Sequence, residues 1–261
     1  MHRDEQLMNQ VLGCVRQAGQ IIRDHWTQTK DVVFKGRIDL VTQTDLAVED
    51  VLRTSLLPLV PGSTLLAEES HTSLEPDEIT WIVDPLDGTT NYAHGIPVVA
   101  VSVALWAHGR VRLGAVYLPM LDELFWGRQG RGAYYNGQRM YVSCENSLQR
   151  SLIATGFPYT VLEEIDPICA RFRAMLASTQ GIRRLGSAAT DLAYTACGRF
   201  AGFYETSLKP WDVAAGWLLV EEAGGTVSAL DGRAFSLSEP MIVASNGHIH
   251  AEMLALLQGT L

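Results

Sequence analysis

The segment Trp81-Ile-Val-Asp-Pro-Leu-Asp-Gly-Thr-Thr-Asn91 carries the strongest structural signal in this sequence. Its apolar start predicts a buried strand, and the strand ends abruptly at two carboxylates, Asp84 and Asp87. The proline between them and the glycine after them predict a tight turn. Such a turn can point both carboxylates and the carbonyl of Leu86 at one spot. These oxygens are the ligands that a hard cation such as Mg²⁺ prefers.

The residues after the turn suit a phosphate group. Gly88, Thr89 and Thr90 stand where a helix could start, and backbone N–H groups at such a position favour an anion. The alternative is a strand followed by an ordinary polar turn with a helix cap. A bare Asp-x-x-Asp-Gly pattern would favour that alternative. The whole segment is far more specific, because the strand, the turn, the paired acids and the hydroxyls agree with one purpose.

Two further acidic features lie at the ends of other predicted elements. Glu68 and Glu69 follow the apolar run Leu65-Leu66-Ala67, and Asp212 opens an apolar helix after Trp211. Alone, the glutamates fit a solvated strand end, and Asp212 fits a helix-start acid favoured by the helix dipole. Acids at the ends of three separate elements can also converge on one site, and metal sites are commonly built that way.

The composition narrows the classes of partner. The sequence has 29 Asp and Glu against 20 Lys and Arg, so its formal net charge is −9. This acidity argues against a broad electrostatic grip on nucleic acid or on anionic lipid. An anionic substrate stays compatible with it where metal cations lie between protein and ligand. The hydrophobic fraction of 47% supports a sizeable core and argues against disorder.

We predict neither a membrane span nor a signal peptide from this sequence. The longest apolar run, from Ile96 to Ala107, is interrupted by Ser102 and is shorter than the roughly 20 residues that a membrane span needs. The first residues are polar and acidic, which is not typical of a signal peptide. The four cysteines are far apart and form no CxxC pair, so we predict reduced thiols in a cytoplasmic protein.

Hydrophobic periodicity divides the first half of the chain into elements. Spacings of three and four predict a helix over residues 5–27, and Thr44 is a candidate cap for a second helix over residues 45–56. A short extended stretch, Asp39 to Thr42, lies between them. Residues 64–135 have the pattern of strands, and Tyr135-Asn136-Gly137 is typical of a hairpin.

Strands and helices alternate in the second half. Strands are predicted at residues 152–154, 203–205 and 241–244, and helices at residues 162–178, 188–197, 212–223 and 248–258. No linker rich in Pro, Gly or Ser separates the halves. We therefore predict one domain over residues 1–261, with sub-domains of roughly 1–145 and 146–261. Both would contain layered helices and strands, an α/β (α+β) fold class.

These motifs together resemble the signatures of the inositol monophosphatase family. The resemblance rests on residues 81–91, on the Glu68-Glu69 pair and on residues 211–225, and it covers nearly the whole chain. It implies a layered αβαβα sandwich of the sugar-phosphatase type. It also implies a magnesium-dependent, lithium-sensitive phosphatase that often forms homodimers.

The resemblance also implies roles for single residues. Asp84 would bridge two metals, and each site would hold two or three Mg²⁺ ions. Thr89 matches a hydroxyl beside the attacking water, Asp45 matches the acid that hydrogen-bonds this threonine, and Glu68 serves the metal that activates the water. The implied metal ligands are Glu68, Asp84, Leu86 (by its carbonyl), Asp87 and Asp212. The implied substrate contacts are Asp87, Gly88, Thr89, Gly186, Ser187, Ala188, Glu205 and Asp212.

Electrostatics supports this assignment. A phosphate monoester dianion repels hydroxide, so its hydrolysis in water is extremely slow. Divalent cations offset that repulsion, lower the pKa of a water and stabilise the departing alkoxide. Four carboxylates supply a charge of about −4, which two Mg²⁺ would balance with about +4.

We predict hydrolysis of myo-inositol monophosphate, because Thr89-Thr90-Asn91 resembles the inositol branch of the family. The alternatives are the same chemistry on fructose 1,6-bisphosphate, 3′-phosphoadenosine 5′-phosphate or histidinol phosphate, or a regulatory binding role in addition to catalysis. Lys209 either contacts the substrate or is solvated, and Arg183 and Arg184 serve either a subunit interface or the substrate rim. His94 fits a structural or surface role better than a place at the site.

Overall fold

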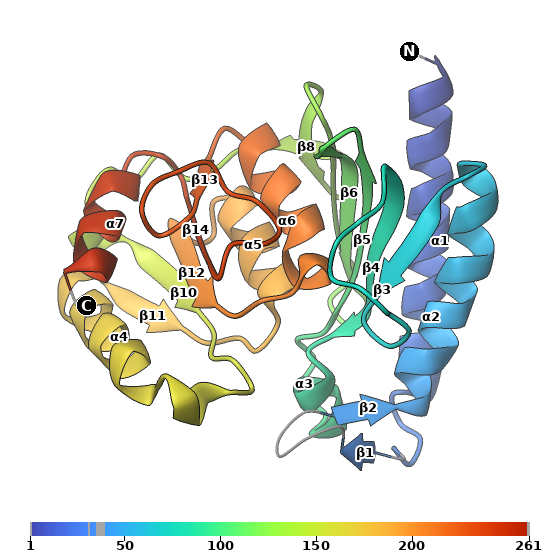
Figure 1. Cartoon of the computed structure of the whole chain (residues 1–261), viewed down its shortest axis with the longest axis horizontal. Helices are drawn as coiled ribbons and strands as arrows, with labels where there is room; N and C mark the ends of the chain where they lie inside the picture. The colour runs from blue at the N-terminus through green and yellow to red at the C-terminus, as the bar shows by residue number, and fades with distance from the viewer. Residues whose placement is uncertain (1, 31, 35–39, 260–261) are drawn as a thin grey trace.

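The computed structural model describes residues 2–30, 32–34 and 40–259, and it shows alternating layers of helices and sheets (Figure 1). In order, the layers are a helix pair, a seven-stranded sheet, a second helix pair, a five-stranded sheet and a third helix pair. Each sheet is covered by helices on both faces, which buries both of its apolar surfaces. The predicted αβαβα sandwich is confirmed. Among the described helices, none combines the length and apolar character needed to cross a bilayer.

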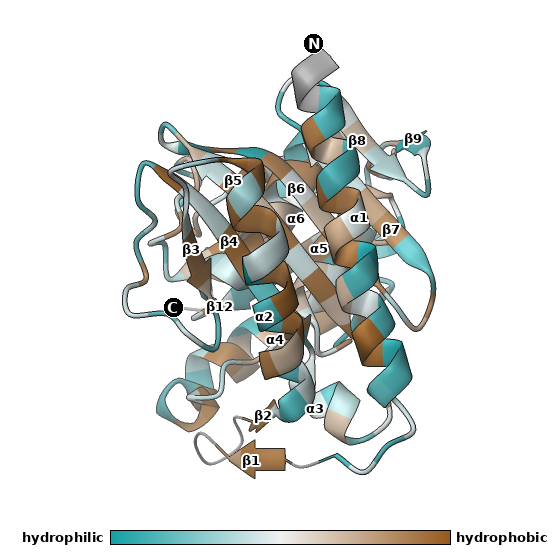
Figure 2. Cartoon of the chain, turned by 90° about the vertical axis from the view of Figure 1, so that its right-hand side faces the viewer, coloured by the Kyte–Doolittle hydropathy of each residue, from teal (hydrophilic) through white to brown (hydrophobic). Residues whose placement is uncertain are grey.

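The first helix pair, α1 (His2–His25) and α2 (Gln43–Leu56), packs against the seven-stranded sheet. Apolar residues three and four apart form a stripe on each helix, and Val15, Ile22 and Leu52 on these stripes are fully buried. Figure 2 shows both helices lying across the sheet, with apolar and polar residues alternating along them. The burial of these stripes holds the helix pair in place.

The seven-stranded sheet follows the order of the chain. Its first two strands are parallel and all later neighbours are antiparallel. The last turn is the hairpin predicted around Asn136 and Gly137, both of which have positive φ. The strands are β3 (Thr64–Ala67), β4 (Ile79–Asp87), β5 (Ala100–Ala107), β6 (Arg110–Leu118), β7 (Glu123–Arg128), β8 (Gly132–Tyr135) and β9 (Gln138–Met140).

The middle helices, α5 (Ala188–Ala196) and α6 (Pro210–Glu222), come from the second half of the chain but also pack on the sheet of the first half. Small residues permit this close packing. A Cβ built on Gly114 of β6 would lie 3.0 Å from the Cα of Ala215 in α6. The two sheets are therefore joined through a shared apolar layer.

The five-stranded sheet has its core on the side of the third helix pair, α4 (Ile165–Ser178) and α7 (His250–Gln258). Four of its strands point in the same direction, and the fifth is antiparallel to both of its neighbours. In spatial order the strands are β11 (Gly181–Arg183), β10 (Leu152–Thr155), β12 (Gly202–Thr206), β14 (Met241–Ser245) and β13 (Thr226–Ser228).

The remaining elements are short. A two-stranded sheet pairs β1 (Val32–Phe34) with β2 (Leu40–Thr42), and α3 (Thr89–Ala93) follows the central motif. Short 3₁₀ helices span Leu57–Leu59, Leu148–Arg150 and Val161–Glu163.

One local prediction is corrected by the structure. The cap of α2 is Thr42, not Thr44, because the Thr42 side chain accepts the N–H of Thr44 while the Asp45 carboxylate accepts the N–H of Thr42. The predicted end of the central strand at the paired acids is confirmed, since β4 ends at Asp87, after a shift in its register with β5. Of the extended stretch predicted from Asp39 to Thr42, Asp39 lies outside the described residues, and the rest is β2.

Candidate active site

A cavity of about 350 Å³ opens between the two halves of the molecule. The first half lines it with residues after β3, at the end of β4 and at the start of α3, and the second half with residues around β10, β12, α5 and α6. The following residues predicted for the site all line it: Glu68, Asp84, Leu86, Asp87, Gly88, Thr89, Gly186, Ser187, Ala188, Glu205 and Asp212.

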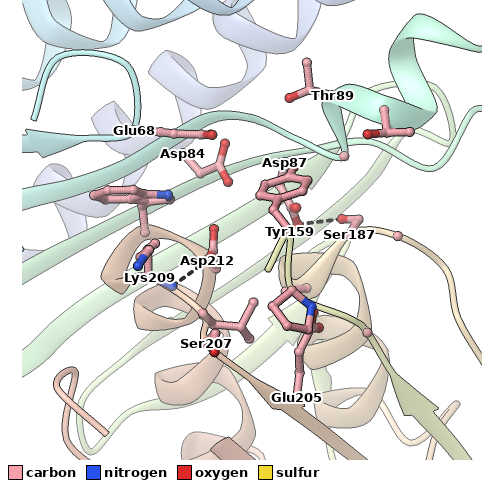
Figure 3. A pocket seen from close by; sticks show the side chains of 18 of the residues that line it. Glu68, Asp84, Asp87, Thr89, Tyr159, Ser187, Glu205, Ser207, Lys209 and Asp212 are labelled. Atoms are coloured by element: carbon pink, nitrogen blue, oxygen red, sulfur yellow. Dashed lines mark hydrogen bonds between the residues drawn. The ribbon is translucent and has the colours of Figure 1, made fainter. Parts of the chain in front are cut away.

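Four acidic side chains from three elements face one part of this cavity (Figure 3). Glu68 follows β3 and its N–H donates to the carbonyl of Val83, which places it next to the bulged end of β4. Asp84 and Asp87 lie on either side of the register shift in β4. Asp212 lies in the first turn of α6, where its carboxylate accepts the N–H of Lys209 at 2.7 Å.

The acids oppose one another's ionisation. Burial raises the pKa of Asp84 well above its ordinary range, and the charges of Glu68, Asp87 and Asp212 raise it further. Burial also raises the pKa of Asp212 well above the ordinary range, with Asp87 and Glu68 adding to the effect. Burial raises the pKa of Asp87 to about 6, while hydrogen bonds from Ser187 and the backbone of the Ala188–Ala189 region lower it. This cluster would be stabilised by any cation that enters it.

The donor chemistry fits a hard divalent cation. The four carboxylates and the carbonyl of Leu86 are all oxygen ligands, which Mg²⁺ prefers. Within the described ranges, no three His, Cys, Asp or Glu side chains form a ready metal-binding group. Hydrogen bonds within the protein explain part of this, since Asp84 accepts the N–H of Leu86 at 3.0 Å, and Asp87 and Asp212 also accept protein donors. The metal ligand set therefore stays a prediction.

Thr89 and Asp45 meet beside the acids. The Thr89 hydroxyl lies 3.2 Å from Asp45 Oδ1 and 3.0 Å from the carbonyl oxygen of Leu86. Asp45 is fully buried, and its other oxygen accepts the N–H and hydroxyl of Thr42. Because the single proton of the threonine points at these acceptors, its oxygen can accept a hydrogen bond from a water in the cavity.

The loop before α5 is bound to the acidic cluster. Ser187 Oγ donates to Asp87 Oδ2 at 2.6 Å, and the N–H of Ala189 donates to the same oxygen at 2.7 Å. Asn91, from the central motif, donates to the carbonyls of Val98 and Leu185 at 2.8 Å each. These bonds connect the two halves of the molecule across the cavity.

Glu205 closes the far wall of the cavity. Burial raises the pKa of Glu205 to about 8, with Arg184 lowering it and Asp87 raising it. A Cβ built on Gly156 would lie 2.1 Å from Glu205 Oε2, so only glycine leaves room for this carboxylate. A carboxyl group in this position can accept or donate a hydrogen bond to a hydroxyl in the cavity, according to its protonation.

Sequence reasoning missed one acid and left several residues undecided. Asp191 of α5 lines the cavity, is 1% exposed, and its Oδ1 has no hydrogen-bond partner in the described part of the chain. Burial, together with Glu205 and Asp87, raises the pKa of Asp191 well above its ordinary range. The available signal was a single acid in an otherwise apolar helix.

Some of the basic residues whose roles the sequence left open line the cavity, and others lie outside it. Arg184 and Lys209 line the cavity, and the guanidinium of Arg184 lies 5.9 Å from the ring centroid of Phe157. Arg183 is exposed and donates to the carbonyl of Ile182. His94 lies just after α3 and does not line the cavity.

Comparison with known proteins shows the family to which the chain belongs. The pattern of the inositol monophosphatase family matches residues 4–260. The chain is 41% identical to "Inositol-1-monophosphatase" of Mesorhizobium japonicum, over 95% of this chain and 94% of that protein. It is 39% identical to "Nus factor SuhB" of Pseudomonas aeruginosa, over 97% of this chain and 96% of that protein.

Structural comparison leads to the same family as sequence comparison. The crystal structure of extragenic suppressor protein SuhB from Bartonella henselae superposes with a TM-score of 0.92 at 39% identity, covering 98% of this chain and all of that one. A match of this extent in both sequence and structure shows common descent. The chain therefore belongs to the inositol monophosphatase family and is a phosphatase.

Proposed function

We propose that the protein is a Mg²⁺-dependent phosphomonoesterase that hydrolyses myo-inositol monophosphate to inositol and phosphate. The observation that carries this proposal is the convergence of Glu68, Asp84, Asp87 and Asp212 on a cavity that also contains the Asp45–Thr89 hydrogen bond. A related structure (28% identity, TM-score 0.83, covering 97% of this chain and 94% of that one) is described as inositol monophosphate bound SaIMPase-II.

The residues divide the chemistry between them. Two or three Mg²⁺ held by Glu68, Asp84, Asp87, Asp212 and the Leu86 carbonyl would activate a water and stabilise the departing alkoxide. The Thr89 oxygen would accept a hydrogen bond from the attacking water and so orient it, while Asp45 and Leu86 hold the threonine hydroxyl in place.

The ring of the substrate would lie toward the second half of the molecule. The Gly186–Ala188 segment and Glu205 line that side of the cavity, and Ser187 is fixed by its bond to Asp87. The Glu205 carboxyl would bind ring hydroxyls. Polar groups that hydrogen-bond a hydroxyl reject analogues that lack it, so this wall would give preference for a polyol ester.

A substrate panel tests the proposal. Phosphate release is measured on inositol 1-phosphate, fructose 1,6-bisphosphate, 3′-phosphoadenosine 5′-phosphate and histidinol phosphate, each with Mg²⁺ and with chelator. We expect the highest kcat/KM on inositol 1-phosphate and loss of activity in chelator. Faster hydrolysis of another ester would refute the substrate assignment, and undiminished activity in chelator would refute the metal dependence.

Two family properties are part of the proposal. A related structure of a staphylococcal inositol monophosphatase (26% identity, TM-score 0.84) is described as a LiCl-soaked inhibitory complex, which supports lithium sensitivity here. A homodimer is supported by exposed apolar side chains near the cavity, at Tyr159, Leu162 and Ile165. Lithium titration of the activity and light scattering of the purified protein test these two points.

The location and a second role are also proposals. All four cysteines are unpaired, which supports the cytoplasmic location. The relatives named Nus factor SuhB favour a binding role in addition to catalysis. The variant Asp84→Asn separates the binding role from catalysis, because a binding role would survive in a protein that has lost turnover.

A further inference from the structure

Glu68 stands in the turn directly after β3, outside any strand or helix. The direction of a side chain in a turn depends on the two peptide groups that flank its Cα, because these groups set the direction of the Cα–Cβ bond. Figure 3 shows the carboxylate of Glu68 pointing toward Asp84. This direction is maintained only if both flanking peptide groups are held.

Hydrogen bonds from three parts of the chain hold these two peptide groups. The N–H of Glu68 donates to the carbonyl of Val83 in β4 at 3.2 Å. The carbonyl of Glu68 accepts the Nδ1–H of His71 at 2.7 Å, since a carbonyl oxygen can only accept. The N–H of Glu69 donates to Glu49 Oε2 at 2.9 Å. The bond to Glu49 therefore fixes the second peptide group from a different element, the helix α2.

The carboxylate of Glu49 is itself buried and held on both sides. Glu49 lies in the middle of α2 and is 5% exposed. Its Oε1 accepts a hydrogen bond from the guanidinium of Arg53, one turn further along the helix, at 2.8 Å. The same nitrogen of Arg53 donates to the hydroxyl of Ser70 at 2.6 Å. The helix α2 thus binds the turn at two consecutive residues, Glu69 and Ser70.

Core packing does not explain a glutamate at this position. Val48 and Leu52 share the buried face of α2, and an apolar side chain there would avoid the cost of burying a carboxylate. Asp45, one turn before Glu49, is also a buried acid on this face, and it accepts the hydroxyl of Thr89. Acids four residues apart disfavour a helix, so this pair indicates a role outside the helix.

We propose that Glu49 is a positioning residue for the phosphatase reaction and holds Glu68 through the N–H of Glu69. One face of α2 then orients both groups that act on the attacking water. Asp45 holds Thr89, and Glu49 holds Glu68. The inference rests on the proposed function, in which Glu68 is a ligand of the metal that activates the water. It does not depend on which phosphate ester is the substrate.

Replacing the carboxylate tests the proposal. Glu49→Met keeps a side chain of similar length and a good helix former but removes the acceptor. We expect its Kd for Mg²⁺ to rise and its kcat/KM to fall, each by about 10–100-fold, as is usual when the support of a metal ligand is lost. Titration calorimetry measures the Kd. Phosphate release from the ester that the wild type hydrolyses fastest measures kcat/KM.

Two further variants separate the hydrogen bond from other effects. Glu49→Gln should keep most of the Mg²⁺ affinity and activity, because its amide oxygen can still accept the N–H of Glu69. Asp50→Ala removes an exposed acid from the same helix and should change neither value. A Glu49→Gln variant as impaired as Glu49→Met would overturn the role of this bond. A lower urea midpoint in Glu49→Met with unchanged Kd and kcat/KM would show a purely structural role and would also overturn it.

A double-mutant cycle shows whether Glu49 acts through Glu68. Glu68→Gln alone should weaken Mg²⁺ binding, and the addition of Glu49→Met should then change the Kd little further. Additive losses would overturn the inference and leave the proposed function intact. A wild-type Kd in Glu68→Gln would overturn both the assignment of Glu68 as a metal ligand and this inference.

Discussion

At the scale of single residues, the hydroxyl of Thr89 is expected to control the rate of turnover. Its proton is shared between Asp45 Oδ1 and the carbonyl of Leu86, which leaves its oxygen as an acceptor facing the cavity. We expect Thr89→Ala to lower kcat by about 10²–10⁴-fold, since an oriented proton acceptor contributes in that range. Its affinity for Mg²⁺, measured by titration calorimetry, should change little.

Asp84→Asn provides the contrast. It removes a charge from the centre of the acidic cluster, so both turnover and Mg²⁺ affinity should fall. Thr54→Ala, which alters an exposed hydroxyl on α2, serves as the control and should change neither. Equal loss of metal affinity in the Thr89 and Asp84 variants would contradict the division of roles.

Glu205 makes stability depend on pH. Burial raises the pKa of Glu205 from 4.5 to about 8, so the folded state keeps a proton that the unfolded state has lost. The stability contribution is complete below about pH 4.5 and is lost as the pH rises to about 8. With chelator present, Glu205→Gln should remove this contribution to the pH dependence of the free energy of unfolding. The contribution between low and high pH is on the order of a few kcal/mol.

Denaturant unfolding at pH 5 and pH 8 measures the effect. Glu252→Gln, on the exposed face of α7, is the matched control and should retain the wild-type difference. Asp84, Asp191 and Asp212 also have raised pKa values, so some slope should persist in Glu205→Gln. A wild type that gained stability toward pH 8 would show that the direction is wrong.

At the scale of elements, the molecule depends on the close approach of α6 to the seven-stranded sheet. A Cβ on Gly114 would lie 3.0 Å from both the Cα and the carbonyl oxygen of Ala215. Gly114→Ala should therefore destabilise the protein by about 1–3 kcal/mol, because backbone atoms cannot move aside as a flexible side chain can. It should also reduce activity, since α6 carries Asp212.

Gly13→Ala is the matched control for this prediction. Gly13 lies on the exposed side of α1 with nothing within 4 Å of an added Cβ. The same substitution there should stabilise the protein by about 0.5–1 kcal/mol, because alanine is the better helix former. Urea unfolding of both variants measures the signs, and a neutral Gly114→Ala would show that the helix and the sheet can separate at little cost.

The long elements were predictable and the short ones were not. The helices α1, α4 and α6 and the strands β5 and β6 have extended apolar periodicity, so their type could be inferred from the sequence alone. The three-residue strands β1, β11 and β13 have too few residues for a pattern. Their pairing partners, not their own side chains, make them strands.

At the scale of the whole molecule, we expect the acidic cluster to couple stability to divalent cations. Mg²⁺ at 100 times its Kd should raise the free energy of unfolding by about 2.7 kcal/mol, which is about 5–10 °C in Tm for a chain of this size. Chelator should reverse the rise, which scanning calorimetry would measure.

Asp84→Asn tests the origin of this effect. Removing one of the mutually repelling charges should make the chelated protein more stable than the chelated wild type, while the gain from Mg²⁺ becomes smaller. A Mg²⁺-induced rise of the same size in Asp84→Asn would place the stabilising ions elsewhere.

The sequence by itself determined the chemical type of this protein. The segment from Trp81 to Asn91 joins a strand, a turn and paired acids over a few residues, and such local patterns are visible without a fold. Glu68 and Asp212 could be recognised as candidates because each follows or opens a clear element. Asp45 was predicted through resemblance, and its bond to Thr89 is present.

Only the tertiary structure decided how the second half completes the site. Asn91 contacts Leu185, Gly156 makes room for Glu205, and the Oδ1 atom of Asp191 has no partner among the described residues. The physical reason is that burial and the pairing of distant side chains depend on how the layers pack, whereas turns and strands depend on neighbouring residues. Turns and strands can therefore be inferred directly from the sequence. Burial and the pairing of distant side chains become visible only in the folded structure.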